Sequence, residues 1–175
     1  KVVFLGTEST GKTVMTNKLF EYFKANKVSE AGRDLIRNSK KFEFEDLEKV
    51  YREHANRIEK VNHGESFLTL IDTDVHITKS YAEFIFGRKL NVPEEIIEKN
   101  KGDLYLYLTK EAEYIQDGTR LEFEERNLLD QSHRKVLKEN EIDFLEISGS
   151  WEEREKMAIE YIKQLILKRQ MIFKV

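Results

Sequence analysis

Residues 6–13 combine glycine, lysine and threonine at a spacing that suits phosphate binding. They read Gly-Thr-Glu-Ser-Thr-Gly-Lys-Thr, the Walker A pattern, and we call them the P-loop. Glycines allow a tight turn that brings backbone N–H groups close to phosphate oxygens. Lys12 offers a positive charge to the terminal phosphates, and the Thr13 hydroxyl can hold Mg²⁺. We therefore expect a nucleoside triphosphate to bind to consecutive residues: Gly6, Thr7, Glu8, Ser9, Thr10, Gly11, Lys12, Thr13 and Val14.

Two aspartates follow an apolar run in the middle of the chain. Asp72 comes directly after residues 67–71, and Asp74 stands two positions later. Proteins with a P-loop place an aspartate at such a strand end to hold the Mg²⁺ shell, which is the role we expect of Asp72. Asp74 suits two roles, as the cap of the next helix or as a contact for a substrate hydroxyl.

The run Glu30-Ala-Gly-Arg-Asp34 is a candidate for the acceptor side of a phosphoryl-transfer site. A carboxylate here could take the proton of an attacking hydroxyl, and Glu30, Asp34 and Asp74 remain equal candidates for that base. Arg33 could clamp an anionic group or simply pair with Asp34. The alternative is a charged strand–helix corner with no part in catalysis.

Residues 110–126 are charged and follow the fourth predicted strand, where a mobile lid could lie. Arg120 and Arg126 would supply positive charge over the transferred phosphoryl group. Tyr114 offers a flat face for a substrate ring, and Asp117 is a further candidate for substrate contact. The alternative for the whole segment is a solvated polar loop.

Trp151 and the histidines are weaker candidates. Trp151 follows the last predicted strand, where it would either pack the final helix or flank an adenine ring, and we include it among the nucleotide-binding candidates. The four histidines show no metal-ligand spacing. His54 is expected on a helix face, and His76 lies near the predicted site through its proximity to Asp74.

These residues need a scaffold that brings them to one edge, and the hydrophobic pattern predicts one. Nearly continuous apolar runs alternate with stretches of helical period, which indicates an open parallel α/β sheet with helices on both faces. We expect a P-loop NTPase fold with five strands, formed as a single domain over residues 1–175 with a small lid near 110–126. The expected strands are residues 2–5, 27–30, 67–71, 104–108 and 142–147.

Composition narrows the classes of partner and location. The net charge of −3 gives no basic excess for a nucleic-acid backbone, so we expect no nucleic-acid partner. The apolar runs are too short to span a bilayer. The absence of cysteine excludes Cys-ligated zinc and iron–sulfur clusters, and it agrees with a cytoplasmic location. We expect a monomer or a small homo-oligomer that acts on a small-molecule nucleoside.

Taken together and in order, four segments resemble the ribosylnicotinamide kinase domain of the NadR-type NAD-salvage proteins. They are the P-loop, Glu30-Ala-Gly-Arg-Asp34, Ile71-Asp-Thr-Asp74 and Tyr114-Ile-Gln-Asp-Gly-Thr-Arg120. The resemblance implies transfer of phosphate from ATP, with Mg²⁺, to the 5′-hydroxyl of nicotinamide riboside, giving nicotinamide mononucleotide. Multifunctional members also carry a nucleotidylyltransferase domain, but this sequence has no His-x-Gly-His motif, so the resemblance implies neither adenylyl transfer nor repression here.

The resemblance also implies roles for individual residues. Asp72 and Asp74 would serve the metal shell and the ribose, and Arg33 and Asp34 would line the substrate side. Tyr114 stands where the family has an aromatic residue, often tryptophan, that can stack on the nicotinamide ring. Gly11, Lys12 and Thr13 would hold the phosphates and Mg²⁺, with lid cations at Arg120 and Arg126.

Two other functions fit the same residues. One is a different kinase of the same class, acting on a deoxynucleoside or a nucleotide. The other is a regulatory module whose bound ATP controls a partner. The arginines of residues 110–126 favour chemistry, because a binding switch has less need of them.

Overall fold

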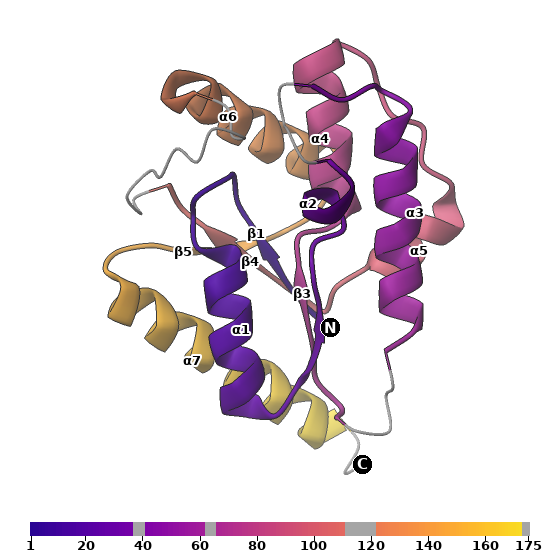
Figure 1. Ribbon diagram of the computed structural model, residues 1–175. Helices are drawn as coiled ribbons and strands as arrows, with labels where there is room; N and C mark the ends of the chain where they lie inside the picture. Colours follow the sequence, from indigo (N-terminus) through magenta and orange to yellow (C-terminus); the bar gives the residue numbers. More distant parts are fainter. Residues whose placement is uncertain (37–40, 62–65, 111–121, 173–175) are drawn as a thin grey trace.

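The computed structural model describes residues 1–36, 41–61, 66–110 and 122–172. It confirms the predicted five-stranded sheet, in which all strands are parallel in the order β2-β3-β1-β4-β5 (Figure 1). The strands are β1 (Val2–Leu5), β2 (Asn26–Val28), β3 (Thr69–Asp72), β4 (Leu104–Leu108) and β5 (Leu145–Ile147). The helices are α1 (Lys12–Phe23), α2 (Gly32–Leu35), α3 (Asp46–Glu59), α4 (Val75–Phe86), α5 (Glu94–Asn100), α6 (Phe123–Glu139) and α7 (Trp151–Ile172).

Side-chain alternation along β1 divides the core into two faces. Val2 and Phe4 pack with the apolar sides of α1 and α7, which cover one face. Val3 and Leu5 pack on the other face with residues of α3, α4 and α6. All four are 0% exposed, as expected for a central strand covered on both faces.

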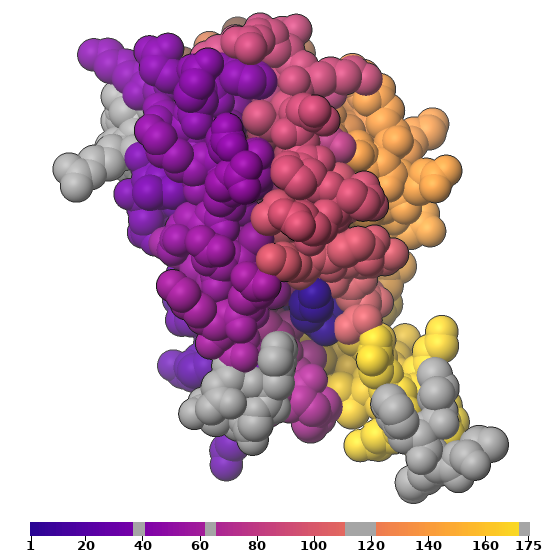
Figure 2. Space-filling view, turned by 90° about the vertical axis from the view of Figure 1, so that its right-hand side faces the viewer, coloured from indigo at the N-terminus to yellow at the C-terminus, as the bar shows by residue number. Residues whose placement is uncertain are grey.

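A further apolar cluster joins α3, α4 and α5 outside the second face. It includes Leu47, Tyr51, Val75 and Ile96. In Figure 2 the purple surface of α3 lies beside the pink surface around α5. This outer packing fixes the position of α3 against α4.

Three predicted strands have different limits in the structure. The strand expected at 67–71 is β3 (Thr69–Asp72), because the chain before it turns outward and leaves Phe67 81% exposed. The strand expected at 142–147 shortens to β5, since the residues before it still close the end of α6, where Ile142 N–H donates to Leu137 O. The strand expected at 27–30 is β2, shifted by a residue and shortened.

Parallel pairing brings the carboxyl ends of β1, β2 and β3 to one edge of the sheet. Phe4 pairs with Asp72, and Thr73 N–H donates to Phe4 O at 3.0 Å. The loops that follow β2 and β3 therefore lie beside the P-loop, which follows β1. Ligands bind at this edge in open α/β sheets. Among the described residues, no helix is both long and apolar enough to cross a membrane.

Candidate active site

The P-loop connects β1 to α1 and depends on glycine at both ends. Gly6 has φ +134°, and a Cβ there would lie 2.5 Å from Leu108 O. Gly11 has φ +89° and caps α1, so the first N–H groups of that helix face the loop. Lys12 Nζ donates to Gly6 O at 2.8 Å and to Thr7 O at 2.9 Å. The charged group that would meet the phosphates thus lies directly against the loop.

Thr13 and Asp72 meet at the position expected for a metal site. Thr13 Oγ1 donates to Asp72 Oδ2 at 2.6 Å, and Asp72 is 2% exposed. Within the described part of the chain, no group of three or more His, Asp or Glu side chains is placed to hold a metal. Mg²⁺ commonly binds through one carboxylate or two, with phosphate and water as its other ligands. The pair of oxygen donors therefore fits Mg²⁺ bound together with a triphosphate.

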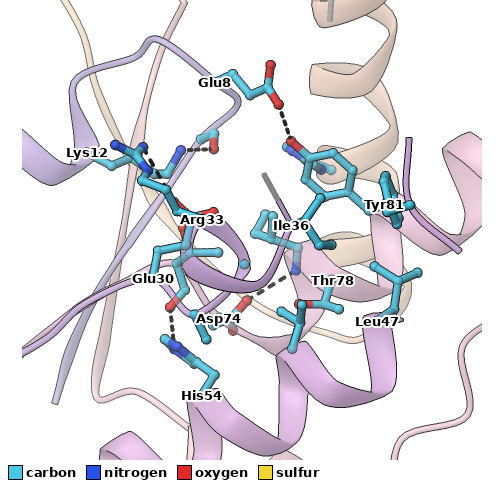
Figure 3. A pocket seen from close by; sticks show the side chains of 18 of the residues that line it. Glu8, Lys12, Glu30, Arg33, Ile36, Leu47, His54, Asp74, Thr78 and Tyr81 are labelled. Atoms are coloured by element: carbon cyan, nitrogen blue, oxygen red, sulfur yellow. Dashed lines mark hydrogen bonds and ion pairs between the residues drawn. The ribbon is translucent and has the colours of Figure 1, made fainter. Parts of the chain in front are cut away.

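Beside the P-loop, a cavity of about 180 Å³ opens between α2, α3 and α4. Figure 3 shows Lys12, Arg33 and Glu30 on one side of it, with Leu47 and Tyr81 on the other. Its described lining holds three carboxylates, Glu8, Glu30 and Asp74, and two cations, Lys12 and Arg33. The apolar lining consists mainly of Ile36, Phe42, Leu47, Val50 and Ile77. A molecule with a polar end and a ring would find both kinds of surface here.

We call this cavity the acceptor pocket, after the role expected of Glu30 and its neighbours, and its carboxylates have different environments. Burial raises the pKa of Glu30 above its ordinary value of 4.5, although the positive charge of Lys12 opposes the shift. Asp74 is 2% exposed and caps α4, where its Oδ1 accepts from His76 N–H at 2.9 Å. Its Oδ2 lies 2.8 Å from His76 Nδ1. The structure therefore confirms Asp74 as the cap of α4 and places it in the pocket lining, where its contact with a substrate hydroxyl stays a prediction.

The candidate base Asp34 lies outside the pocket. Its side chain is 60% exposed and forms an ion pair with Arg57 of α3 at 2.8 Å. Arg33 pairs with Glu30 at 3.6 Å, whereas a pair with Asp34 was one of the two alternatives that the sequence left open. The cause is the short helix α2, which turns the two neighbouring side chains in different directions.

Arg126 also differs from its prediction. It lies in the first turn of α6, because residues 123–126 are helical and not in a loop. The side chain is 1% exposed, and its Nε donates to Glu8 O at 2.9 Å. Arg126 thus contacts the backbone of the P-loop from a buried position.

Trp151 is the first residue of α7, and its ring borders the P-loop. A Cβ on Gly11 would lie 2.9 Å from the ring, so glycine is needed there for close approach. The ring also packs against the core between α1, α7 and the sheet. Val14, the last residue proposed for nucleotide contact, is 59% exposed on α1. Tyr114, Asp117 and Arg120 lie outside the described residues.

Several pocket residues had no marker in the sequence. Tyr81 of α4 donates its hydroxyl to Glu8 Oε1 at 3.0 Å, and burial keeps the pKa of Tyr81 well above its ordinary value. His54, expected on a helix face, is 4% exposed and lines the pocket, with Nε2 3.1 Å from Thr73 O. His133 of α6 and Phe42 also line it. These residues enter the site through the packing of α3, α4 and α6, which local sequence does not reveal.

A family model described as AAA domain matches residues 1–154. The chain belongs to this AAA domain family. This chain is 25% identical over 173 residues to the trifunctional NAD biosynthesis/regulator protein NadR of Salmonella typhimurium. The match covers 94% of this chain and 42% of NadR. The chain thus spans less than half the length of that relative.

Solved structures show the same architecture. The crystal structure of NadR protein in complex with NR superposes with a TM-score of 0.75 at 22% identity, over 94% of this chain and 50% of that one. Thymidylate kinase from Ehrlichia chaffeensis gives a TM-score of 0.64 at 15% identity, over 94% of this chain and 97% of that one. The sequence similarity to NadR confirms the resemblance, and the solved structures show that the chain has the fold of P-loop kinases.

Proposed function

We propose that the protein transfers the terminal phosphate of ATP to the 5′-hydroxyl of nicotinamide riboside, giving nicotinamide mononucleotide. The observation that carries the proposal is the continuity between the P-loop and the acceptor pocket, since Lys12 lines both. Sequence similarity to a trifunctional NAD biosynthesis protein, and the likeness to a NadR structure in complex with NR, support this choice of acceptor.

Glu30 is the carboxylate that best suits the role of base. Both oxygens of Asp74 already face groups of His76, and Asp34 is outside the pocket. The raised pKa of Glu30 makes its carboxylate a stronger proton acceptor than an ordinary glutamate. In the proposed step the 5′-oxygen forms a bond to the γ-phosphorus, the bond between this phosphorus and the β,γ-bridging oxygen breaks, and Glu30 receives the hydroxyl proton.

The remaining residues position the reactants and neutralise charge. In a loose phosphoryl-transfer transition state, positioning and electrostatics supply most of the rate enhancement. Lys12 would hold the terminal phosphates, while Thr13 and Asp72 would hold Mg²⁺. Mg²⁺ held by these two residues would supply positive charge to neutralise the phosphates. Asp74 would accept a hydrogen bond from a ribose hydroxyl.

The charge of the acceptor pocket favours a nucleoside over a nucleotide. Glu8, Glu30 and Asp74 outnumber the two cations in its lining, and Arg33 is already paired with Glu30. A phosphorylated acceptor would bring almost two further negative charges among these carboxylates. A nucleotide kinase, which the likeness to thymidylate kinase keeps as the second candidate, would need a cationic subsite for that phosphate.

Release of ADP with and without nicotinamide riboside tests whether the protein is a kinase at all. We expect the acceptor to stimulate ADP release at least about tenfold, and Lys12→Ala to abolish the stimulation and so exclude a contaminating ATPase. Tight nucleotide binding without acceptor-dependent turnover would instead indicate a regulatory module.

A further inference from the structure

Three cations hold backbone carbonyl groups of the P-loop. Lys12 binds the carbonyls of Gly6 and Thr7, and Arg126 binds that of Glu8. Arg154 Nη1 binds the carbonyl of Thr10 at 3.2 Å. The C=O of one residue and the N–H of the next belong to the same planar peptide, so fixing a carbonyl also fixes the direction of the N–H donor that follows it. Those donors are the groups that a P-loop offers to phosphate oxygens.

Arg154 links the P-loop to two other strand ends. It lies on α7, is 1% exposed, and its Nε donates to Gly149 O at 2.9 Å. Its Nη2 donates to Thr109 O at 3.1 Å. Gly149 follows β5 and Thr109 follows β4, so one guanidinium joins the loops after β1, β4 and β5. The planar fork of arginine presents several donors at fixed angles, which suits three acceptors on separate segments.

The first turn of α7 is itself fixed in place. Ser150 N–H donates to Glu153 Oε2 at 2.7 Å, and Glu153 N–H donates to Ser150 Oγ at 3.3 Å, which together form a capping box. Trp151 in the same turn borders Gly11. This turn therefore meets the P-loop at two points, through a ring at Gly11 and through a guanidinium at Thr10.

We propose that Arg154 is a positioning residue for triphosphate binding. It fixes the Thr10 carbonyl so that the P-loop already has its phosphate-binding shape before the nucleotide arrives. Lys12 must turn toward the phosphates in the proposed reaction, whereas Arg154 holds the loop without touching the nucleotide. Its buried positive charge also favours a polyanion close by. The inference rests on the ATP-binding half of the proposed function and is independent of the acceptor.

Calorimetric titration with Mg-ATP, without acceptor, tests the proposal. We expect Arg154→Met to raise the Kd for ATP at least about tenfold, because a flexible loop must be ordered on binding. Arg154→Lys keeps the charge but loses the fork, and its Kd should rise by about threefold or more. Arg169→Met is the matched control, since Arg169 lies further along α7 and pairs with Asp103; its Kd should stay within about twofold of wild type.

Two further measurements separate a positioning role from general stability. Thermal unfolding shows whether each variant is folded, and the emission of the single tryptophan reports on the P-loop. Trp151 is the sole tryptophan of the chain and lies against Gly11, so its emission without ligand reports on the shape of the P-loop. We expect the emission of Trp151 to change in both Arg154 variants and to stay as in wild type in Arg169→Met. If Arg154→Met does not fold, Arg154→Lys carries the test. An ATP Kd within about twofold of wild type in a folded Arg154 variant would overturn the inference, whichever acceptor the enzyme uses.

Discussion

Single residues show how carboxylates in one small region receive different tasks. Asp72 lies beside a threonine hydroxyl, which suits a metal. Asp74 caps the start of α4, so its carboxylate is held in one orientation, which suits a fixed acceptor of hydrogen bonds. Glu30 is held where burial raises its pKa, which suits transfer of a proton. Geometry therefore distinguishes Glu30 from Asp74, which the sequence left as equal candidates for the base, and the position of Asp72 suits the separate metal role expected of it.

The role proposed for Glu30 predicts a specific pH dependence. Only its carboxylate can accept a proton, and its raised pKa means that this form is lost at a higher pH than for an ordinary glutamate. We therefore expect kcat of the wild-type enzyme to fall on the acid side of its pH profile. Glu30→Gln should lower kcat by about 100-fold and remove that acid limb. Asp34→Asn is the matched control, because Asp34 lies outside the pocket. Its kcat should stay within about twofold of wild type, and its pH profile should keep the acid limb.

Loss of the P-loop lysine should be more harmful than loss of any one carboxylate. The proton acceptor contributes less than charge neutralisation when the transition state is loose, because the charge on the transferred group must always be neutralised. We expect Lys12→Ala to reduce kcat/KM by about 1000-fold or more, measured under the same conditions as Glu30→Gln. A smaller loss in Lys12→Ala than in Glu30→Gln would contradict the proposed division of roles.

At the scale of elements, the predicted strands were found, but their limits were not all correct. A buried strand has a strong local signature, since its residues are apolar without interruption, as in residues 104–108. Strand ends depend on the neighbouring strand and on the closure of the preceding helix, which explains the errors before Thr69 and Leu145. Arg126 was assigned to a lid for a similar reason, because the first turn of α6 is charged and reads as a loop.

The parts of the site formed by consecutive residues were predictable, and the parts formed by helix packing were not. The P-loop directly follows β1, Asp72 ends β3 and Asp74 lies two residues beyond it, so local sequence places all three. Tyr81, His54 and the P-loop contact of Arg154 depend on where α4, α3 and α7 lie against the sheet. No residue spacing within a single helix contains that information.

The packing of α4 on α6 predicts how stability depends on pH. His133 is 1% exposed, and its Nδ1 lies 2.8 Å from Ser80 Oγ across this interface. Burial lowers the pKa of His133 to about 3, from an ordinary value of 6.5, and Lys12 adds a smaller effect of the same sign. The unfolded chain therefore binds a proton that the folded one does not, and the free energy of unfolding falls as pH decreases from 6.5 toward 3.

This fall should approach about 1.4 kcal/mol per pH unit for His133, measured by denaturant unfolding at several pH values. His133→Gln should flatten the dependence below pH 6.5, even if the variant is less stable at neutral pH. Burial also lowers the pKa of His54, so a double variant with His54→Gln should flatten it further. An unchanged slope in His133→Gln would contradict the neutral state assigned to this residue.

For the whole molecule, the distribution of charge matters more than the small net value of −3. Cations border the P-loop at Lys12, Arg126 and Arg154, where the triphosphate would bind. Carboxylates are in excess in the adjacent acceptor pocket. One side of the site is therefore built for an anion and the other for a group that is neutral or cationic, such as a nucleoside with a pyridinium ring.

A steady-state comparison of acceptors tests whether nicotinamide riboside is the substrate that receives the phosphate. Nicotinamide riboside, thymidine and a nucleoside monophosphate would be compared at saturating Mg-ATP, with each phosphorylated product identified. We expect kcat/KM for nicotinamide riboside to exceed that for either competitor at least about tenfold, a difference of about 1.4 kcal/mol in transition-state stabilisation. Phosphorylation of thymidine or of the monophosphate, with none of nicotinamide riboside, would contradict the account.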